Sequence, residues 1–363
     1  PTKPQFCTGS RGSLLLLPSL SAPVLSIQIA SSRKQKQWGG NRWWPRISWI
    51  CPLIANVINN RRVTRKKGDK EWCYLSQKWT QSECAEPGVW DTVNEECGKK
   101  EQSPINIVTN KVKYKEDLKP FTFEGYNTNQ SSPWRIENNG HTVKVSLSGS
   151  AKIGGGGLRN KYNAIEFHFH WGTSKGFSLG SEHSIDGERY AMELHIVHRK
   201  EDFSTTEQAV TDKEGLAVLG FFIKTGAKNE NYEPLIEMLN EVALKGSQKN
   251  MTSLPLESLI PAKVNLTRYY RYNGSLTTPN CNQAVVWTIF QEPIILKESQ
   301  VENFLETLYF TKNKTLLMTD NFRPVQPLND RIVYRSDVSV VQPPAKALLV
   351  VPTLIYVMSL LFQ

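Results

Sequence analysis

Apolar and polar residues alternate with a period of two in several short stretches between positions 121 and 290. Successive side chains of an extended strand point to opposite faces, so this period predicts half-buried strands. The stretches are 121–123, 142–147, 164–171, 192–197, 217–223 and 284–290. Clusters of Gly, Pro, Asn and Ser separate them and favour turns, notably at Gly154–Gly157.

Two further stretches, 232–243 and 299–310, instead repeat apolar residues three and four positions apart. That spacing places the apolar side chains on one face of a helix. We therefore expect a mainly β domain of the α+β class, with a large sheet and peripheral helices.

One predicted strand, 164–171, carries histidine on a single face. The alternation places Glu166, His168 and His170 together and puts aromatic residues on the other face. Residues two apart on a strand are separated by about 7 Å, which is near enough for two imidazoles to bind one metal ion.

A second predicted strand repeats this arrangement, with Glu193 and His195 on one face. Metal-bound histidines usually donate their other N–H to a carboxylate or carbonyl, and each strand has a carboxylate two residues before a histidine. Three neutral imidazoles with one open position are typical of catalytic zinc sites. All six histidines lie between His141 and His198, which favours a common role for several of them.

The net charge of +10 suggests a nucleic-acid binder, but the excess belongs to the first 71 residues. They hold 13 Lys/Arg and 2 Asp/Glu, whereas the rest of the chain holds 31 and 32. The body of the protein therefore lacks a basic footprint, and we expect no nucleic-acid partner.

The six cysteines form no C-x-x-C pair, which argues against a thiolate metal site. Five N-x-S/T sequons and an even number of cysteines favour a secreted glycoprotein with disulfide bonds. The sequons begin at Asn129, Asn250, Asn265, Asn273 and Asn313.

Residues 1–71 form a leader whose apolar stretch 14–30 follows Arg11, as in the core of a signal peptide. We expect this basic leader to be disordered or absent from the mature protein. The domain is then expected to begin at Trp72 and to end at Ser336.

The chain ends with a 16-residue apolar run, 347–362, shorter than the roughly 20 residues of a membrane span. A polar spacer, 337–346, precedes the run, and the small residue Ser336 precedes the spacer. This order is typical of a GPI-attachment signal. We expect 337–363 to be removed and Ser336 to carry the anchor, so that the secretory pathway delivers the protein to the extracellular face of the plasma membrane. A short hydrophobic anchor or a core helix is the alternative.

Seven motifs occur in an order that resembles alpha-class carbonic anhydrases, most closely the GPI-anchored type IV isozymes. They are Gln102–Ile107, Asn138–His141, Phe167–Trp171, Gly180–Ser184, Glu193–His195, Gly274–Pro279 and Asn321–Pro324. The resemblance covers Trp72 to Ser336 and the tail. It implies a single domain with a twisted, mostly antiparallel sheet of about ten strands, surrounded by helices.

The resemblance implies zinc-dependent, reversible hydration of CO₂ to bicarbonate and a proton, with Zn²⁺ bound by His168, His170 and His195. Zinc lowers the pKa of its water to about 7, which supplies hydroxide at neutral pH. By the same resemblance, Thr277 accepts the hydrogen bond of the hydroxide and donates its own to Glu182.

Other roles also follow from the resemblance. His141 corresponds to the proton shuttle, and the ordinary histidine pKa of about 6.5 suits that task. Thr278 lines the substrate position with Thr277, beside an apolar wall for CO₂ formed by Val197, Val218, Leu276 and Trp287. His183 and His198 correspond to packed structural histidines.

The implied disulfides are Cys73–Cys84 and Cys97–Cys281. The implied partners are CO₂ and bicarbonate, the membrane through the anchor, and bicarbonate transporters, for a monomeric enzyme.

The resemblance also assigns residues that hold the ligands: Glu193 holds His195, and the Asn321 carbonyl holds His170. At Glu166 the sequence departs from the family, which commonly has glutamine there. A carboxylate strengthens His168 as a donor and adds negative charge, so we expect a modestly raised activity pKa. Lys144 is expected to add a cationic lining.

Two other readings remain open at this point. A cupin-type metal oxygenase also uses H-x-H on a strand, but it predicts iron and a downstream glutamate ligand. A catalytically silent module of the same family predicts a missing zinc ligand or a blocked cleft.

Overall fold

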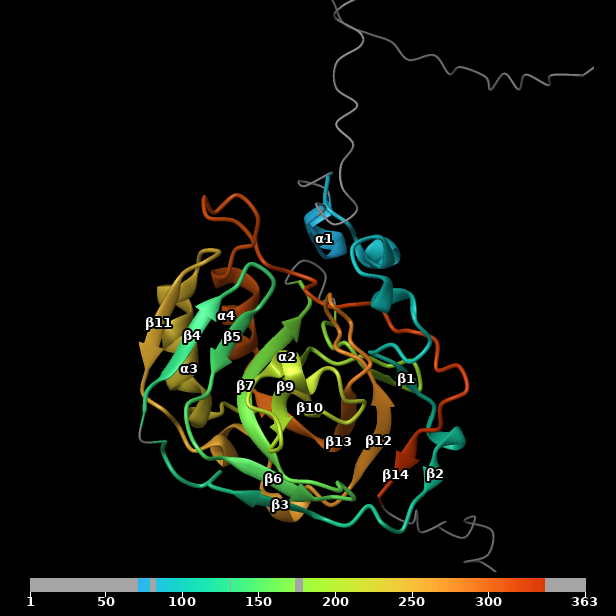
Figure 1. Ribbon diagram of the computed structural model, residues 1–363. Coiled ribbons are helices and arrows are strands. Elements are labelled where there is room, and N and C mark those ends of the chain that lie inside the picture. Colours follow the sequence, from blue (N-terminus) through green and yellow to red (C-terminus); the bar gives the residue numbers. More distant parts are fainter. Residues whose placement is uncertain (1–70, 79–82, 131, 174–178, 337–363) are drawn as a thin grey trace, which may run out of the picture. The chain divides into compact units, whose positions relative to one another are not determined.

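The computed structural model describes residues 71–78, 83–130, 132–173 and 179–336 (Figure 1). The expected leader, except Glu71, and the expected GPI spacer and apolar tail lie outside these ranges. Within them, no helix is both long enough and apolar enough to cross a membrane.

A twelve-stranded sheet with mostly antiparallel neighbours forms the centre of the described fold (Figure 1). Its main path runs β11 (Gln248–Met251), β4 (Trp134–Asn138), β5 (Val143–Ser146), β7 (Tyr162–Trp171), β9 (Met192–Lys200), β10 (Leu216–Thr225), β13 (Val285–Leu296), β12 (Tyr269–Gly274), β14 (Tyr334–Arg335) and β2 (Lys113–Tyr114). Off this path, β3 (Phe121–Glu124) pairs with β6 (Lys152–Gly155), which pairs with β7. The parallel pairs are β10–β13, β14–β2 and a separate sheet of β1 (Asn106–Ile107) with β8 (Ser184–Ile185).

Short helices surround the sheet. The α-helices are α1 (Leu75–Lys78), α2 (Thr206–Ala209), α3 (Glu233–Leu239) and α4 (Glu298–Thr307). The 3₁₀ turns are η1 (Pro87–Thr92), η2 (Glu95–Gly98), η3 (Thr109–Lys111), η4 (Glu230–Tyr232), η5 (Asn240–Val242), η6 (Leu256–Leu259) and η7 (Lys263–Asn265).

The prediction of a single, mainly β domain is confirmed, with twelve strands in the main sheet where about ten were expected. All six predicted strands are present. The predicted helix 232–243 is a succession of η4, α3 and η5, and the predicted helix 299–310 is α4. The glycine cluster belongs partly to β6, and the turn begins at Gly155, where φ becomes positive and glycine is favoured.

The alternation in the central strands separates two hydrophobic clusters. Phe167 and Phe169 of β7 belong to the larger cluster, whereas Val197 of β9 belongs to the smaller one. Helix α4 covers the larger cluster, with the Phe304 ring centroid 5.0 Å from that of Phe169. The histidine face of β7 and β9 is consequently left free of helix packing from α4.

Two disulfides link the N-terminal part of the described chain. Cys73 pairs with Cys84, and Cys97 pairs with Cys281 across a sequence separation of 184 residues. These are the pairs that the resemblance implies. The second one joins the segment before β1 to the turn that follows Thr277 and Thr278.

Candidate active site

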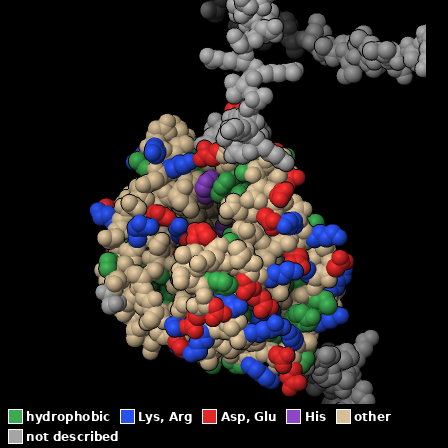
Figure 2. Space-filling view, in the orientation of Figure 1, with side chains coloured by type: hydrophobic (Ala, Val, Ile, Leu, Met, Phe, Trp, Pro, Cys, Tyr) green, Lys and Arg blue, Asp and Glu red, His purple; other side chains and the backbone are tan. Residues whose placement is uncertain are grey.

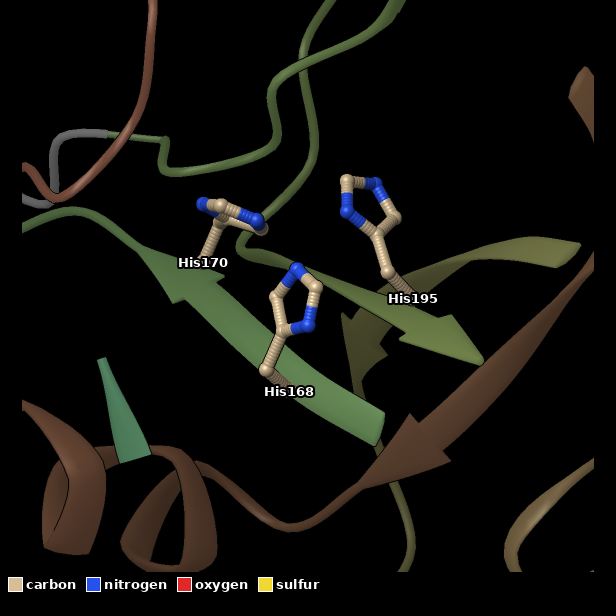
Figure 3. A group of neighbouring side chains, drawn as sticks. All are labelled: His168, His170 and His195. Carbon is tan, nitrogen blue, oxygen red and sulfur yellow. The ribbon is translucent and has the colours of Figure 1, made fainter. Parts of the chain in front are cut away.

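Three imidazoles converge from two neighbouring strands (Figure 3). His168 and His170 lie on β7, and His195 lies on β9 directly opposite His168. One nitrogen of each ring lies within 4.8 Å of the corresponding nitrogens of the others. His170 and His195 are almost fully buried, whereas His168 keeps 17% of its side chain exposed. The cluster is therefore open to solvent mainly on the side of His168.

The second nitrogen of each ring lies against a fixed acceptor. His195 Nε2 is 2.6 Å from Glu193 Oε1, and His170 Nδ1 is 2.8 Å from the Asn321 carbonyl oxygen. His168 Nδ1 is 3.3 Å from Glu166 Oε1. These contacts orient the rings and leave the other nitrogens, His168 Nε2, His170 Nε2 and His195 Nδ1, free to act as ligands.

The chemistry of this donor set fits Zn²⁺. Burial lowers the pKa of His170 to about 3 and that of His195 to about 4, so both rings are neutral at physiological pH. His170 Nε2 is buried without a hydrogen-bond partner in the described structure, and such an atom is costly unless something binds it. Neutral imidazoles with one solvent-facing side suit a catalytic zinc ion.

A second group, His183, Glu193 and His195, also brings ligand atoms together, but these atoms already bind one another. Glu193 Oε1 lies 2.7 Å from His183 Nδ1, and Glu193 Oε2 accepts the His183 backbone N–H at 2.8 Å. Burial would raise the pKa of Glu193, but the two imidazoles hold that pKa well below its usual range. We therefore read this group as the support of His195.

Glu166 belongs to a chain of charges that crosses three strands. Its Oε2 lies 3.5 Å from Lys144 Nζ, and Lys144 lies 2.9 Å from Glu137 Oε1. Lys144 is paired with His168 in the register of β5 and β7, and with Glu137 in that of β4 and β5. Lys144 was expected to line the site, but it does not belong to the lining of the cavity next to His168 and His195. Its two carboxylate partners were missed, because the pairing of β5 with β4 and β7 carries no local sequence signal.

A cavity of about 200 Å³ lies next to His168 and His195. Its lining includes all the residues expected around the substrate: Val197, Val218, Leu276, Thr277, Thr278 and Trp287. Glu166 and Thr206 also line it. Figure 2 shows a hollow with histidine at its rim on this side of the molecule. The space beside the histidines thus has an apolar wall and a few hydroxyl groups.

Glu182 is completely buried behind this cavity, with Oε2 3.4 Å from His170 Nε2. Burial raises the pKa of Glu182, whereas nearby His195, the Arg323 backbone N–H at 2.8 Å and the Thr277 side chain lower it. Arg323 is itself held by Gln102 Oε1 and the Ser103 carbonyl. The structure thereby brings together three separate sequence motifs around one carboxylate.

His141 is stacked on Trp72, with ring centroids 3.6 Å apart and planes 13° from parallel. Its side chain does not belong to the lining of the 200 Å³ cavity. Burial, followed by the charge of Lys245, lowers its pKa to about 4. The stacked ring is therefore neutral at physiological pH. His198 is likewise placed away from the cluster, with Nε2 2.5 Å from the Tyr126 hydroxyl.

Comparisons with known proteins agree with this geometry. The family model described as eukaryotic-type carbonic anhydrase matches residues 85–337. Carbonic anhydrase 4 of Rattus norvegicus is 42% identical over 289 residues, which cover 79% of this chain and 91% of the relative. Carbonic anhydrase 4 of Oryctolagus cuniculus is 42% identical over 79% of the chain and 92% of the relative. Carbonic anhydrase 12 of Homo sapiens is 36% identical over 71% of the chain and 73% of the relative.

The substitution Glu193→Gln tests the support of His195. An amide cannot accept from both imidazoles with the strength of a carboxylate, so we expect zinc affinity to fall by 10- to 100-fold. Competition with a chromogenic chelator measures the affinity. Glu188→Gln, an exposed residue, is the control and should bind zinc like the unmodified chain. An unchanged affinity in folded Glu193→Gln would contradict the assignment.

Proposed function

Since the chain belongs to the eukaryotic-type, alpha-class carbonic anhydrase family and has its carbonate dehydratase activity, we propose that it hydrates CO₂ at the cell surface through zinc and a histidine proton shuttle. The observation that carries the proposal is the cluster of three buried imidazoles, each oriented by its own acceptor, beside a cavity with an apolar wall. His168, His170 and His195 hold the ion.

When bound, zinc acts as a Lewis acid and lowers the pKa of a coordinated water to about 7. The protein contributes binding and orientation. Val197, Val218, Leu276 and Trp287 form an apolar wall against which CO₂ can lie. Thr278 lies at the same cavity and can hydrogen-bond to an oxygen of the substrate.

Thr277 and Glu182 orient the attacking oxygen. Glu182 accepts a hydrogen bond from the Thr277 hydroxyl, because an ionised carboxylate has no proton of its own to donate. The hydroxyl oxygen of Thr277 is then left as an acceptor on the cavity side. This fixed direction selects one orientation of the nucleophile, in which a lone pair faces CO₂.

His141 relays the released proton to solvent. In the stack on Trp72 its pKa is about 4, too low for exchange at neutral pH, so the relay requires the ring to turn out of the stack into water. A solvated imidazole regains a pKa near 6.5, which suits proton transfer.

The proposed cell-surface location rests on the C-terminal signal and on the two disulfides. Disulfides persist in oxidising compartments such as the secretory pathway and the cell exterior. Ser336, the last described residue, donates its hydroxyl to the Thr267 carbonyl, just before β12. We propose Trp72–Ser336 as the mature domain, with the anchor on Ser336 and bicarbonate transporters as partners of a monomer.

Stopped-flow CO₂ hydration by the zinc-loaded protein, with zinc content measured in parallel, tests the function. We expect one zinc per chain and fast, sulfonamide-sensitive hydration that increases from pH 6 to pH 9. Thr277→Val should lower kcat/KM by about 100-fold through loss of the oriented acceptor. Thr122→Val, an exposed strand position, is the control. Zinc without hydration would leave a binding module, and absence of zinc would overturn the site.

Glu166 should set the pH midpoint of the activity. Its carboxylate strengthens His168 as a donor, while Lys144 offsets part of the charge. Glu166→Gln is therefore expected to lower the midpoint by about half a pH unit, or roughly 0.7 kcal/mol. Lys144→Met removes the counter-charge of Glu166, so the full negative charge remains beside His168 and the midpoint should rise. The pH profile of kcat/KM measures both shifts, and equal midpoints in all three proteins would exclude the effect.

His141→Ala should slow hydration by about tenfold in weak buffer, since proton transfer then depends on water alone. Added imidazole should restore the rate by carrying the proton directly. The loss should appear in kcat and leave kcat/KM nearly unchanged. A loss that imidazole does not reverse would mean that His141 acts through structure.

Phosphatidylinositol-specific phospholipase should release the enzyme from intact cells that express the full chain. Activity measured in the supernatant and the pellet reports the release. Ser336→Trp, which places a bulky residue at the attachment position, should retain less enzyme at the surface. Enzyme that stays with the membrane after treatment would favour another mode of attachment.

A further inference from the structure

A second cavity, of about 360 Å³, lies on the part of the sheet formed by β12, β13 and β14. It shares no lining residue with the 200 Å³ cavity beside the histidines. Arg271 of β12 and its cross-strand neighbour Thr288 of β13 lie on the face opposite Trp287, because successive strand residues alternate. Trp287 lines the 200 Å³ cavity, so Arg271 and Thr288 face away from the proposed zinc site.

Arg271 supplies a buried positive charge to this cavity. Arg271 is only 7% exposed. Its Nε and Nη2 both donate to Thr288 Oγ1, at 3.2 and 2.9 Å. Over the described ranges, no acceptor binds Nη1. Burial lowers the pKa of Arg271 and the charge of Glu214, which lines the same cavity, raises it, but no carboxylate of the described residues forms an ion pair with the guanidinium. A buried guanidinium that lacks a direct ion pair favours an additional anionic partner.

The free edge of Arg271 has the geometry of an anion receptor. Because Thr288 occupies the edge formed by Nε and Nη2, the outer edge formed by Nη1 and Nη2 keeps one N–H from each nitrogen. Two parallel N–H groups of this kind match the oxygens of a carboxylate or phosphate. Burial also lowers the pKa of Arg271 to about 10, so the group stays charged at neutral pH.

The charges around the opening also favour an anion. Lys115, Arg159 and Arg331 line the cavity with Arg271, against only two carboxylates, Glu214 and Asp330. Lys115 and Arg159 are exposed, and neither has an ion-pair partner within the described residues. Arg331 is already held by backbone carbonyls, so Lys115 and Arg159 are the cations available to attract a ligand.

The inner wall is more apolar than an inorganic anion requires. Tyr162 and Val286 are buried there, and the Tyr162 hydroxyl is engaged with the Glu214 carbonyl. The tyrosine therefore presents ring surface to the cavity. A volume of about 360 Å³ also leaves room for an organic body behind the charged head.

We propose that this cavity is a second, non-catalytic binding site for a small organic anion, with a carboxylate or phosphate monoester head bound by the outer edge of Arg271. The apolar body of the ligand lies against Tyr162 and Val286, and Lys115 and Arg159 attract the anion from solvent.

Calorimetric titration of the zinc-loaded full chain tests the site, with a tight sulfonamide closing the catalytic cavity. The probes are phenyl phosphate, benzoate and inorganic phosphate. We expect one site for phenyl phosphate or benzoate, with an affinity that weakens as salt increases. Inorganic phosphate should bind at least tenfold more weakly than phenyl phosphate. No heat with either organic probe, or equal affinity for the two phosphates, would overturn the proposal.

Two sets of variants locate the binding. Arg271→Gln should weaken phenyl phosphate by at least tenfold while the CO₂ hydration rate, which reports an intact fold, stays unchanged. The double variant Lys115→Gln/Arg159→Gln alters exposed residues only, so it decides the question if Arg271→Gln does not fold. It should weaken binding about threefold to tenfold at low salt. Lys312→Gln, also exposed, is the matched control. Binding that all these variants leave unchanged would place the ligand elsewhere.

Discussion

The carboxylate of Glu193, buried completely between two imidazoles, is the interaction on which the rest of the site depends. It accepts from His195 on its own strand and from His183, whose other nitrogen lies 2.6 Å from the Tyr272 hydroxyl. That hydroxyl in turn donates to Ser103 Oγ. One buried charge thus connects β9, β12 and the segment before β1. The free-energy cost of removing this carboxylate from water is offset only when every member of the network is in place. The orientation of His195 therefore depends on the packing of β9, β12 and the segment before β1.

Several parts of the site could be read from the sequence because their signals are local. A period of two places His168 and His170 on one face whatever the fold, and Glu193 beside His195 for the same reason. The central strands also follow from alternation. Strand β12 gave no such signal, because its run of Tyr, Tyr, Arg and Tyr is buried on both faces.

The contacts that were missed join residues far apart in the chain. Trp72 covers His141 across 69 positions, and Glu137 reaches Lys144 only because β4 pairs with β5 in one register. A shift of one residue would turn Lys144 to the opposite face. Glu166 would then lose its ion pair with Lys144 and keep its contact with His168. The balance of charge beside the metal ligands therefore depends on strand register, which short sequence patterns do not specify.

The disulfide between Cys97 and Cys281 has a consequence for the durability of the molecule outside the cell. It joins two points between which most of the central sheet lies. If a protease cuts one peptide bond in a surface loop between them, the two fragments remain a single covalent molecule. The disulfide prevents the fragments from diffusing apart, so the hydrogen bonds of the sheet need only keep the strands in register. A nicked enzyme is consequently expected to keep its histidine cluster assembled until the disulfide itself is reduced.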